Sequence, residues 1–580
     1  MFKFFKSMTW FIKKNWYRYV LVFFFGILGT ALNLLPTFIV GRLTDRITLG
    51  TVTFDFLIYE TLIPFLIVCF AIYGNALLRR TCMNFLTTKA YYALHRRYID
   101  SIMAEDASFF ERFQSGDLLV RAIGDINTVK FSVGNRVINI IVEAFNVIGA
   151  FVMMVLINPI LAVSTFIPLS LIIVFNILFK GKVMRNWKQV REESSMMGNA
   201  VLESITNVRT IRAYNKEEDS LKKNLLYSER TYVAEYNNLK VNVIFEPLFT
   251  LIVGLSTFIC FALGAYFYFS GNLTNGASDL VKFSMYLGLF QKPLTMIGDL
   301  ITKFYQSLIS ADRLNEVYNS KSSVIDKNNL SLDKIEEIEF RNFSFKYPQD
   351  NYYVLHSINL TIKKGETVGI VGKTGAGKST LSRQLARQLP IDDNTIFING
   401  TPIEEYDKKE IRKHVSYVPQ EHVLFSRSVY DNVSLGDKNP TREMVDKAIE
   451  LADFKKDLSS LSDGLDTIVG EYGVTLSGGQ KQRLGIARAL LNNSDVLVLD
   501  DSLSAVDGKT EANIINTLKT YRADKTNIIV CHRLSAVKHA NKIIVLDDGK
   551  IVESGTHEDL IKNQGWYYEQ FISQKMEVEL

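Results

Sequence analysis

The sequence predicts an all-α membrane domain of six transmembrane helices fused to an α/β P-loop domain. Two observations predict this division. Roughly the first 300 of the 580 residues are dominated by long apolar, Phe-rich stretches, whereas the remainder alternates short apolar strands with helix-compatible segments. In that second part, residues 372–379 read Gly-Lys-Thr-Gly-Ala-Gly-Lys-Ser, which is a complete P-loop.

Six apolar stretches are each about 20 residues long, the length that crosses a bilayer as a helix. Six in one chain are poorly explained as buried helices of a soluble protein, so we predict a multi-pass membrane protein that contacts the lipid bilayer. The predicted spans are 19–40, 56–78, 137–157, 159–179, 244–269 and 281–301.

Four acidic residues lie inside these spans: Glu60, Glu143, Glu246 and Asp299. Ionisable groups are costly in hydrocarbon and are therefore functional candidates. Glu143 lies in the middle of its span. A polar internal pathway and a simple interhelical hydrogen bond explain it equally well.

Basic residues indicate how the chain is oriented in the membrane. They cluster before the first span, after the second and after the fourth, and are absent from 158–159 and 271–278. The positive-inside rule then places both termini and both long polar connections in the cytoplasm. These connections favour helices that extend beyond the bilayer, with tips near 108–113 and 210–214. Aromatic residues at the tips suggest docking onto another surface.

Composition excludes some classes of protein. The net charge of +5 is small for this length and gives no reason to expect nucleic acid as a partner. The four cysteines are scattered without metal-ligand spacing. The N-terminus lacks the features of a secretory signal. A Lys- and Asn-rich chain without a targeting segment indicates a bacterial plasma (cell) membrane.

The P-loop has the sequence context that a phosphate site requires. A short apolar strand, 367–371, leads into the loop, and a helix-compatible segment begins at Lys378. Backbone N–H groups and the helix N-terminus then cradle phosphates, Lys378 reaches the β- and γ-phosphates, and Ser379 ligates Mg²⁺. The predicted cofactors are ATP and Mg²⁺. The predicted ATP-binding residues of this segment are Gly372, Lys373, Thr374, Gly375, Ala376, Gly377, Lys378, Ser379 and Thr380.

An acidic pair completes the predicted hydrolytic site. Residues 496–500 read as a buried strand, Val-Leu-Val-Leu-Asp, followed directly by Asp501. We expect Asp500 to hold Mg²⁺. Asp501 occupies the position of the base that activates the attacking water.

A second anion-binding element lies between the P-loop and this pair. Residues 476–480 read Leu-Ser-Gly-Gly-Gln at a predicted helix start. One nucleotide does not need two phosphate cradles in one chain, but two chains packed head to tail use both. With these motifs the sequence resembles the ATP-binding cassette (ABC) family over nearly its whole length. The order of its parts resembles an exporter-type half-transporter, with the membrane domain ahead of the cassette.

The resemblance implies three segments: a transmembrane domain at 1–319, a linker at 320–334 and the cassette at 335–580. It also implies that the two cytoplasmic tips are coupling helices, the second docking onto the opposite chain's cassette. Glu471 matches the exporter-type loop that meets these helices.

Further site residues follow from matching the family's motifs. Tyr347 resembles the aromatic that stacks on adenine, Gln420 the glutamine that contacts Mg²⁺, and His532 the histidine that senses the γ-phosphate. The implied catalytic residues are Asp501, His532 and Gln420, and the implied magnesium ligands are Ser379, Gln420 and Asp500. The residues implied to contact ATP outside the P-loop are Tyr347, Ser477, Gly478, Gly479, Gln480 and Asp507.

Asp501 is the main departure from the family, where Glu is usual. The shorter side chain withdraws the carboxylate by roughly 1 Å, and loss of a general base costs about 10²–10⁴ in rate. An Asp here beside an intact signature resembles the degenerate-site subunit of a heterodimeric multidrug-type exporter, whose partner half-transporter holds the Glu. Because His532 is retained, the site is weakened rather than dismantled.

The predicted function is therefore ATP-driven export of small amphipathic compounds, multidrug or lipid-like, by one half of a heterodimer. Two alternatives remain open from the sequence. One is a regulatory or sensing membrane protein gated by ATP, and the other is an importer on the same fold.

Overall fold

The computed structural model describes residues 2–270, 276–328, 330–348, 350–470, 473 and 476–579. The chain divides into two compact units. One unit comprises Met1–Ile102 and Gly116–Asn319, and the other comprises Met103–Ser115 and Ser320–Leu580. Glu471 lies outside the described residues.

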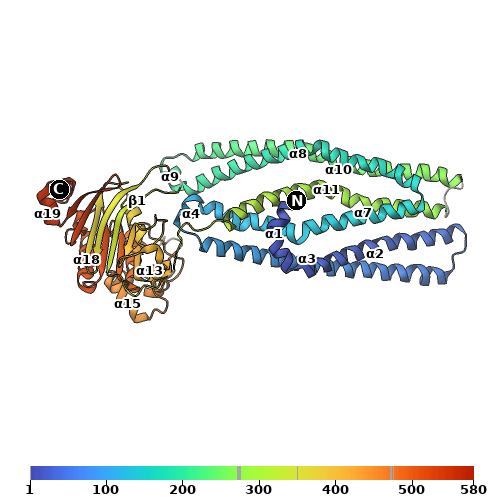
Figure 1. The fold of residues 1–580 in the computed structure, drawn as a ribbon. Helices are drawn as coiled ribbons and strands as arrows, with labels where there is room; N and C mark the ends of the chain where they lie inside the picture. The colour runs from blue at the N-terminus through green and yellow to red at the C-terminus, as the bar shows by residue number, and fades with distance from the viewer. Residues whose placement is uncertain are drawn as a thin grey trace. The chain divides into compact units, whose positions relative to one another are not determined.

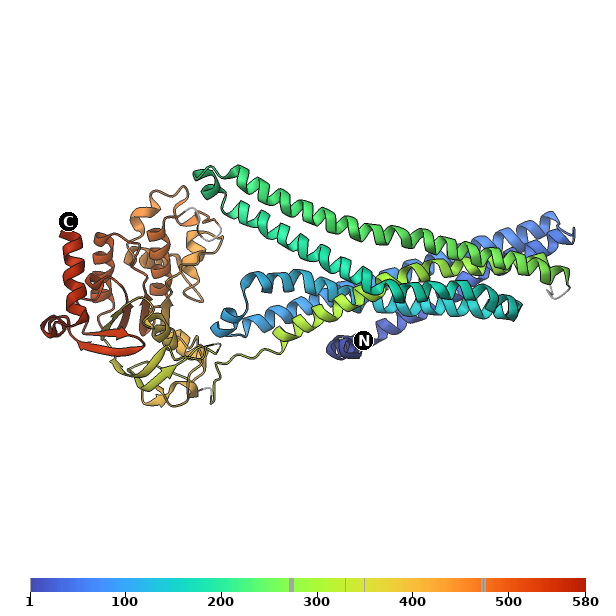
Figure 2. The ribbon, with the colours of Figure 1, turned by 90° about the horizontal axis from the view of Figure 1, so that it is seen from above.

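The first unit is built from long helices that run side by side, with α8 and α10 forming one extended antiparallel pair (Figures 1 and 2). Helices α2, α7 and α11 pack against one another. The helices are α1 (Phe2–Lys14), α2 (Trp16–Thr48), α3 (Ile63–Met103), α5 (Ser115–Val120), α6 (Ile126–Phe131), α7 (Val137–Ile157), α8 (Pro159–Thr206), α9 (Val208–Ala213), α10 (Glu217–Phe269) and α11 (Ala277–Tyr318), with short π-helical segments η1 (Phe56–Leu62), η2 (Arg121–Asp125) and η3 (Ser132–Arg136) between some of them.

All six predicted spans fall within these helices, and the helical membrane domain is confirmed. Among the described residues, four helical segments are long and apolar enough to cross a membrane, and α8 adds a shorter apolar stretch, Pro159–Ile172. The four segments are Trp16–Thr48, Phe56–Met103, Ser115–Ile157 and Pro247–Phe269. The remaining predicted span lies in α11.

The chain reverses between α7 and α8 at Asn158. This residue has an extended backbone, and its side chain accepts a hydrogen bond of 3.0 Å from the N–H of Leu161. Pro159 follows at the first helical position, where its missing N–H costs nothing. The two residues therefore end one helix and start the next without a loop.

The second unit contains two sheets. An antiparallel sheet has the order β2-β1-β4-β5, and a six-stranded sheet has the order β10-β9-β3-β8-β7-β6. In the larger sheet, only the pairing of β10 with β9 is antiparallel. The strands are β1 (Glu337–Phe345), β2 (Leu355–Lys363), β3 (Thr367–Gly372), β4 (Ile396–Ile398), β5 (Thr401–Pro402), β6 (Val415–Val418), β7 (Val496–Asp500), β8 (Thr526–Val530), β9 (Lys542–Asp547) and β10 (Lys550–Gly555).

Helices cover the larger sheet, and strands β7 and β8 are buried along their whole length. Burial along the whole strand is the pattern of a parallel sheet covered on both faces. Two large apolar clusters fill the space around the sheets. The helices of this unit are α4 (Ala107–Arg112), α12 (Lys378–Leu385), α13 (Lys408–His414), α14 (Val429–Ser434), α15 (Arg442–Leu451), α16 (Lys455–Leu458), α17 (Gly478–Leu491), α18 (Gly508–Tyr521), α19 (His557–Asn563) and α20 (Trp566–Glu579).

The two predicted cytoplasmic tips are both short helices. The first is α4, which groups with the second unit although it follows the long helix α3. The second is α9, whose six residues include none that is buried.

Candidate functional site

The site lies where parallel strands of the larger sheet end. In the register of the sheet, Ile370 of β3 pairs with Val530 of β8, and Val530 pairs with Asp500 of β7. The carboxyl ends of three strands therefore meet at one edge, the usual place for a ligand in an open α/β sheet. The P-loop, the acidic pair and His532 each follow one of these strands.

Two glycines allow the P-loop to turn tightly. A Cβ on Gly372 would lie 2.0 Å from the carbonyl oxygen of Leu546, so no side chain fits there. Gly377 has φ +93°, and a Cβ on it would lie 3.1 Å from the carbonyl oxygen of Val354. The loop then runs directly into the N-terminus of α12, where unpaired N–H groups favour an anion.

Lys378 is nearly buried beneath the loop. Its Nζ donates hydrogen bonds of 2.8 Å to the carbonyl oxygens of Gly372 and Lys373. Burial lowers the pKa of Lys378, and the nearby charges of Asp501 and Asp500 oppose that shift. The ammonium group is held at the centre of the loop, where it can meet phosphate oxygens.

Asp500 is 1 % exposed and accepts hydrogen bonds from three hydroxyl groups. Ser379 Oγ donates to Oδ1 at 2.9 Å, while Tyr417 Oη and Ser382 Oγ donate to Oδ2 at 2.6 and 3.2 Å. Hydroxyl donors orient the carboxylate without bringing a positive charge. Together with the amide of Gln420 in the same pocket, these oxygens match the ligands that Mg²⁺ prefers.

Asp501 adopts a left-handed backbone conformation, with φ +48°. Its N–H donates to the carbonyl oxygen of Val530 at 2.9 Å, and Ser504 Oγ donates to its carbonyl oxygen at 2.9 Å. Gln420 Nε2 donates to its carboxylate at 3.4 Å. Burial raises the pKa of Asp501, while His532 lowers it. The raised pKa favours proton acceptance, the chemistry expected of a base.

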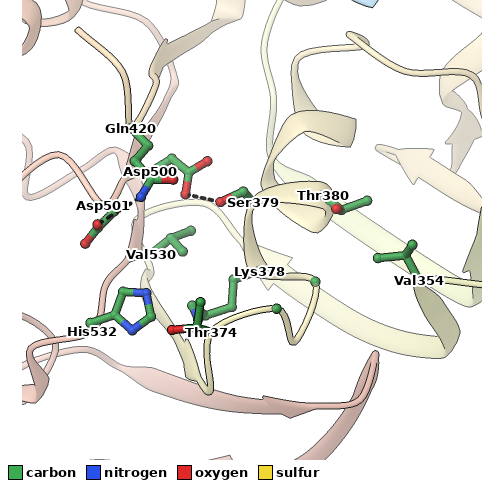
Figure 3. A pocket seen from close by; sticks show the side chains of 12 residues that line it. Val354, Thr374, Lys378, Ser379, Thr380, Gln420, Asp500, Asp501, Val530 and His532 are labelled. Atoms are coloured by element: carbon green, nitrogen blue, oxygen red, sulfur yellow. Dashed lines mark hydrogen bonds between the residues drawn. The ribbon is translucent and has the colours of Figure 1, made fainter. Parts of the chain in front are cut away.

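A pocket of about 210 Å³ brings most of the predicted residues together (Figure 3). Two apolar residues, Val354 and Val530, were missed by the sequence reasoning, because an apolar residue beside a strand carries no chemical signal. The predicted residues that line the pocket are Thr374, Gly375, Gly377, Lys378, Ser379, Thr380, Gln420, Asp500, Asp501 and His532.

The other predicted ATP contacts lie outside this lining. Tyr347 points its hydroxyl at Thr380 Oγ1, 3.0 Å away, and its ring packs against Phe345. Asp507 caps α18 by accepting from the N–H of Thr510. Gly372, Lys373 and Ala376 belong to the loop itself, and Ser477, Gly478, Gly479 and Gln480 belong to the start of α17.

The signature forms the helix start that the sequence predicts. Ser477 caps α17, accepting from the N–H of Gln480, and the Gln480 side chain accepts from the N–H of Ser477. Gly479 allows a close approach, because a Cβ there would lie 2.9 Å from the carbonyl oxygen of Ala505. No residue from 477 to 480 lines the P-loop pocket of the same chain.

Tyr417 and Ser382 are site residues that the sequence reasoning missed. Tyr417 lies on β6, beside β7, and three residues before Gln420, so its place in the motif was visible. Its contact with Asp500 depends on the register of two strands, which a motif does not encode.

A P-loop, an acidic strand end and a capped Ser-Gly-Gly helix start in one α/β unit define an ATPase of the cassette class, fused to a helical membrane unit. Comparisons with known proteins agree. Residues 19–294 match the family model "ABC transporter transmembrane region", and residues 355–504 match the model "ABC transporter". The chain belongs to the ABC transporter family.

Several relatives match along almost the full chain. A Bacillus subtilis (strain 168) protein, "Probable multidrug resistance ABC transporter ATP-binding/permease protein YheI", is 37 % identical, covering 99 % of this chain and 98 % of its own. The "Multidrug resistance-like ATP-binding protein MdlA" of Escherichia coli (strain K12) is 29 % identical over 99 % and 97 %. The "ATP-dependent lipid A-core flippase" of Shigella flexneri is 30 % identical over 84 % and 83 %.

The fold has a solved counterpart. A bacterial Atm1-family ABC exporter with ATP bound superimposes with a TM-score of 0.84 at 25 % identity, covering 97 % of this chain and 98 % of that chain. The protein is thus a multi-pass ABC exporter whose cassette binds ATP and couples its hydrolysis to transport.

Proposed function

We propose that this chain is the degenerate-site half of a heterodimeric exporter that moves small amphipathic compounds, multidrug or lipid-like, out of a bacterial cell across its plasma membrane. The carrying observation is that Asp501 stands at the position of the base while the signature at 477–480 is intact. A chain that keeps its signature but has a weakened base is suited to a partner chain that carries Glu at the position of Asp501.

In the proposed site, the P-loop and Lys378 hold the phosphates, and Ser379, Asp500 and Gln420 hold Mg²⁺. When bound, Mg²⁺ neutralises charge on the phosphate oxygens. Asp501 accepts a proton from the attacking water, and His532 contacts the γ-phosphate. Tyr347 is assigned to adenine.

Asp501 acts as a weak base for a geometric reason. A general base must lie within about 3 Å of the proton that it removes. The side chain of Asp501 is one methylene shorter than that of Glu, so its carboxylate reaches less far. The Gln420 amide bonded to its carboxylate further restrains it. The left-handed backbone also suits Asp, which is enriched at positive φ among non-glycine residues.

The signature is assigned to the partner's site. Ser477, Gly478, Gly479 and Gln480 present a helix N-terminus, which attracts phosphate. Their absence from this chain's pocket lining supports a role in the opposite site. Asp507 is assigned to the same contact between the two chains.

For the membrane part, we propose that both termini lie in the cytoplasm. Basic residues cluster before the first span, after the second and after the fourth, and such clusters face the cytoplasm. The names of two relatives, a multidrug resistance protein and a lipid A-core flippase, support an amphipathic substrate. The exposed helix α9 is assigned to docking on the partner's cassette.

The oligomer is tested by ATP turnover in lipid nanodiscs. We expect the chain alone to hydrolyse ATP at least tenfold more slowly than the chain copurified with a half-transporter that carries Glu after its strand-end Asp. Robust turnover by the chain alone, abolished by Lys378→Ala, would establish a working homodimer and refute the proposal.

The weakened base is tested in a heterodimer whose partner site is inactivated. Asp501→Glu is expected to raise turnover at this chain's site at least tenfold, within the range typical of a general base. Asp501→Asn is the matched control, because it keeps the size and the tolerance of positive φ but cannot accept the proton. Equal turnover of the wild type, Asp501→Glu and Asp501→Asn would refute the claim that Asp501 is a weakened general base.

The direction of transport is tested with inside-out vesicles and a fluorescent amphipathic dye. ATP-dependent accumulation inside the vesicles corresponds to export from the cell. ATP-dependent depletion of preloaded dye would indicate an importer. Nucleotide-induced closure without dye movement would indicate a sensor.

A further inference from the structure

The magnesium-binding carboxylate of the proposed site is held by more than the P-loop. Asp500 Oδ2 accepts a 2.6 Å hydrogen bond from Tyr417 Oη, the shortest of its three bonds to hydroxyl groups. Ser382 Oγ lies 3.4 Å from the same tyrosine oxygen. Burial, followed by the charge of Asp500, raises the pKa of Tyr417, so the hydroxyl stays protonated and can only donate to the carboxylate.

Tyr417 in turn lies beside a charged residue at the far end of the P-loop helix. Arg383 is in the last turn of α12, one residue after Ser382. Burial lowers the pKa of Arg383, but Tyr417, Tyr347 and Asp500 together outweigh burial and raise it. The Arg383 guanidinium group therefore lies close enough to Tyr417 and Asp500 for their charges to act on it.

The first cytoplasmic tip reaches this same arginine. Glu111 of α4 places Oε1 3.6 Å from Arg383 Nη1, and the N–H of Ala107 donates to the carbonyl oxygen of Gln388 at 3.2 Å. Helix α4 is thus attached at the C-terminal end of α12. Its position relative to the P-loop helix is defined by two contacts of different kinds.

Asp106 fastens the same tip to the start of the cassette segment. Its Oδ1 accepts from the N–H groups of Ser108 and Phe109, which caps α4. Its Oδ2 accepts from Ser323 N and Oγ at 2.6 and 2.7 Å and from the N–H of Val324 at 3.2 Å. One buried carboxylate therefore joins α4 to residues 323–324. Because of these bonds, we expect a movement of α4 to move residues 323–324 as well.

We propose that the first cytoplasmic tip acts on the magnesium ligand of its own cassette through Glu111, Arg383 and Tyr417. Arg383 and Tyr417 are positioning residues: they orient Asp500 and do not touch the nucleotide. When α4 shifts, the guanidinium group shifts with it, and Tyr417 changes its hold on Asp500 Oδ2. This inference rests on the proposed function for the assignment of Mg²⁺ to Asp500.

The test is a Mg²⁺ titration of fluorescent ATP-analogue binding by the full-length chain in nanodiscs, a readout that needs no turnover. Tyr417→Phe removes one hydroxyl, and we expect the half-saturating Mg²⁺ concentration to rise about tenfold, the low end for loss of a group that orients a metal ligand. Glu111→Gln is expected to raise it about threefold, because it weakens a contact one step further away. An unchanged titration in Tyr417→Phe would overturn the proposal.

A double-mutant cycle separates transmission from independent effects. If Glu111 acts through Tyr417, Glu111→Gln has no further effect in the Tyr417→Phe background. Additive shifts would overturn the proposal. The matched control is Asp466→Asn, which breaks a 3.3 Å ion pair with Arg442 on the surface of the same cassette and is expected to change nothing.

Two further variants keep the result interpretable. Arg383→Lys keeps the positive charge but not the planar guanidinium group, and a shift between those of wild type and Tyr417→Phe is expected. Asp500→Asn tests the underlying assignment. If it leaves the Mg²⁺ titration unchanged, the proposed metal site itself fails; if only Tyr417→Phe is without effect, the network alone fails.

Discussion

Each half of the molecule contains a carboxylate that is mostly shielded from solvent, and the two carboxylates have different kinds of neighbour. In the cassette, Asp500 accepts hydrogen bonds from three neutral hydroxyl groups. In the membrane unit, Glu143 accepts from Asn146 Nδ2 at 3.0 Å and lies 3.4 Å from the Lys292 ammonium. Asp500 is therefore oriented but left with its charge for a cation, whereas the charge of Glu143 is already matched.

The contrast shows that a carboxylate can bind a cation in the cassette and hold helices together in the membrane unit. Thr30 of α2 donates to Asn146 Oδ1 at 2.8 Å, so the Glu143 cluster joins α2, α7 and α11. These contacts favour an interhelical role for Glu143 over a polar pathway. The side chains of Glu246 and Asp299, the other acidic candidates of the later spans, lie outside what the structure describes, and Glu60 pairs with Arg42 at 3.6 Å.

The largest expected difference comes from neutralising each carboxylate with its amide. Asp500→Asn is expected to raise the Mg²⁺ concentration needed for ATP-analogue binding at least about 100-fold, since removal of merely outer partners costs about 10–100-fold. Glu143→Gln should leave that titration within about twofold. A similar shift in both variants would show that the two carboxylates are not distinct in function.

The next largest effect concerns His422, a histidine of the cassette, and the dependence of stability on pH. Both ring nitrogens of His422 are buried and have no hydrogen-bond partner in the described part of the chain. Burial, followed by the charge of Arg488, lowers the pKa of His422 to about 4. An unfolded histidine has a pKa near 6.5, so the unfolded state binds more protons between these values, and stability falls as the pH falls through that window.

We expect His422 to contribute a loss of about 2 kcal/mol in the free energy of unfolding between pH 7 and pH 5. Denaturant unfolding of the full chain at both pH values measures it. His422→Gln, which does not titrate, is the control and should show a smaller loss. Equal losses in the two proteins would mean that the histidine is not held neutral.

Glycines give a third comparison, because they are required for different reasons in the two units. A Cβ on Gly26 would lie 2.5 Å from Val142 Cγ2, a side-chain obstacle between membrane helices. Gly26→Ala is expected to cost about 1–2 kcal/mol in detergent unfolding, and Val142→Ala should recover most of it. Gly377→Ala should not be rescued by Leu355→Ala, because the backbone of Val354 and the positive φ remain.

Failure of Val142→Ala to rescue Gly26→Ala would show that the membrane glycine, too, is required by its backbone. Rescue of Gly377→Ala by Leu355→Ala would show that the P-loop glycine is required only because of the Leu355 side chain.

The smallest effect is expected for one interhelical hydrogen bond. Thr30→Val removes the bond to Asn146 and should cost about 0.6 kcal/mol, the average for such bonds in a membrane protein. A double-mutant cycle with Asn146→Leu isolates the coupling. A coupling above about 2 kcal/mol would exceed the largest value measured for such bonds and would contradict the prediction.

Much of the cassette site could be predicted because its motifs are local. The residues from Thr374 to Thr380 are contiguous, and a glycine-rich turn before a helix is a ready-made anion-binding arrangement. Tyr417 illustrates what was missed. It was visible beside Gln420, but a tyrosine on a strand is ordinary until its neighbouring strand is known.

By itself the sequence determined the division into membrane and cassette parts, the positions of the helices that contain the six predicted spans, and the residues of the P-loop and acidic pair. These depend on length, apolarity and short-range spacing, which the order of residues contains directly. Only the tertiary structure decided what surrounds each charge: hydroxyl groups at Asp500, a lysine at Glu143, and the contact of α4 with the P-loop helix. Such neighbours come from segments far apart in the chain, and packing alone determines which of them meet.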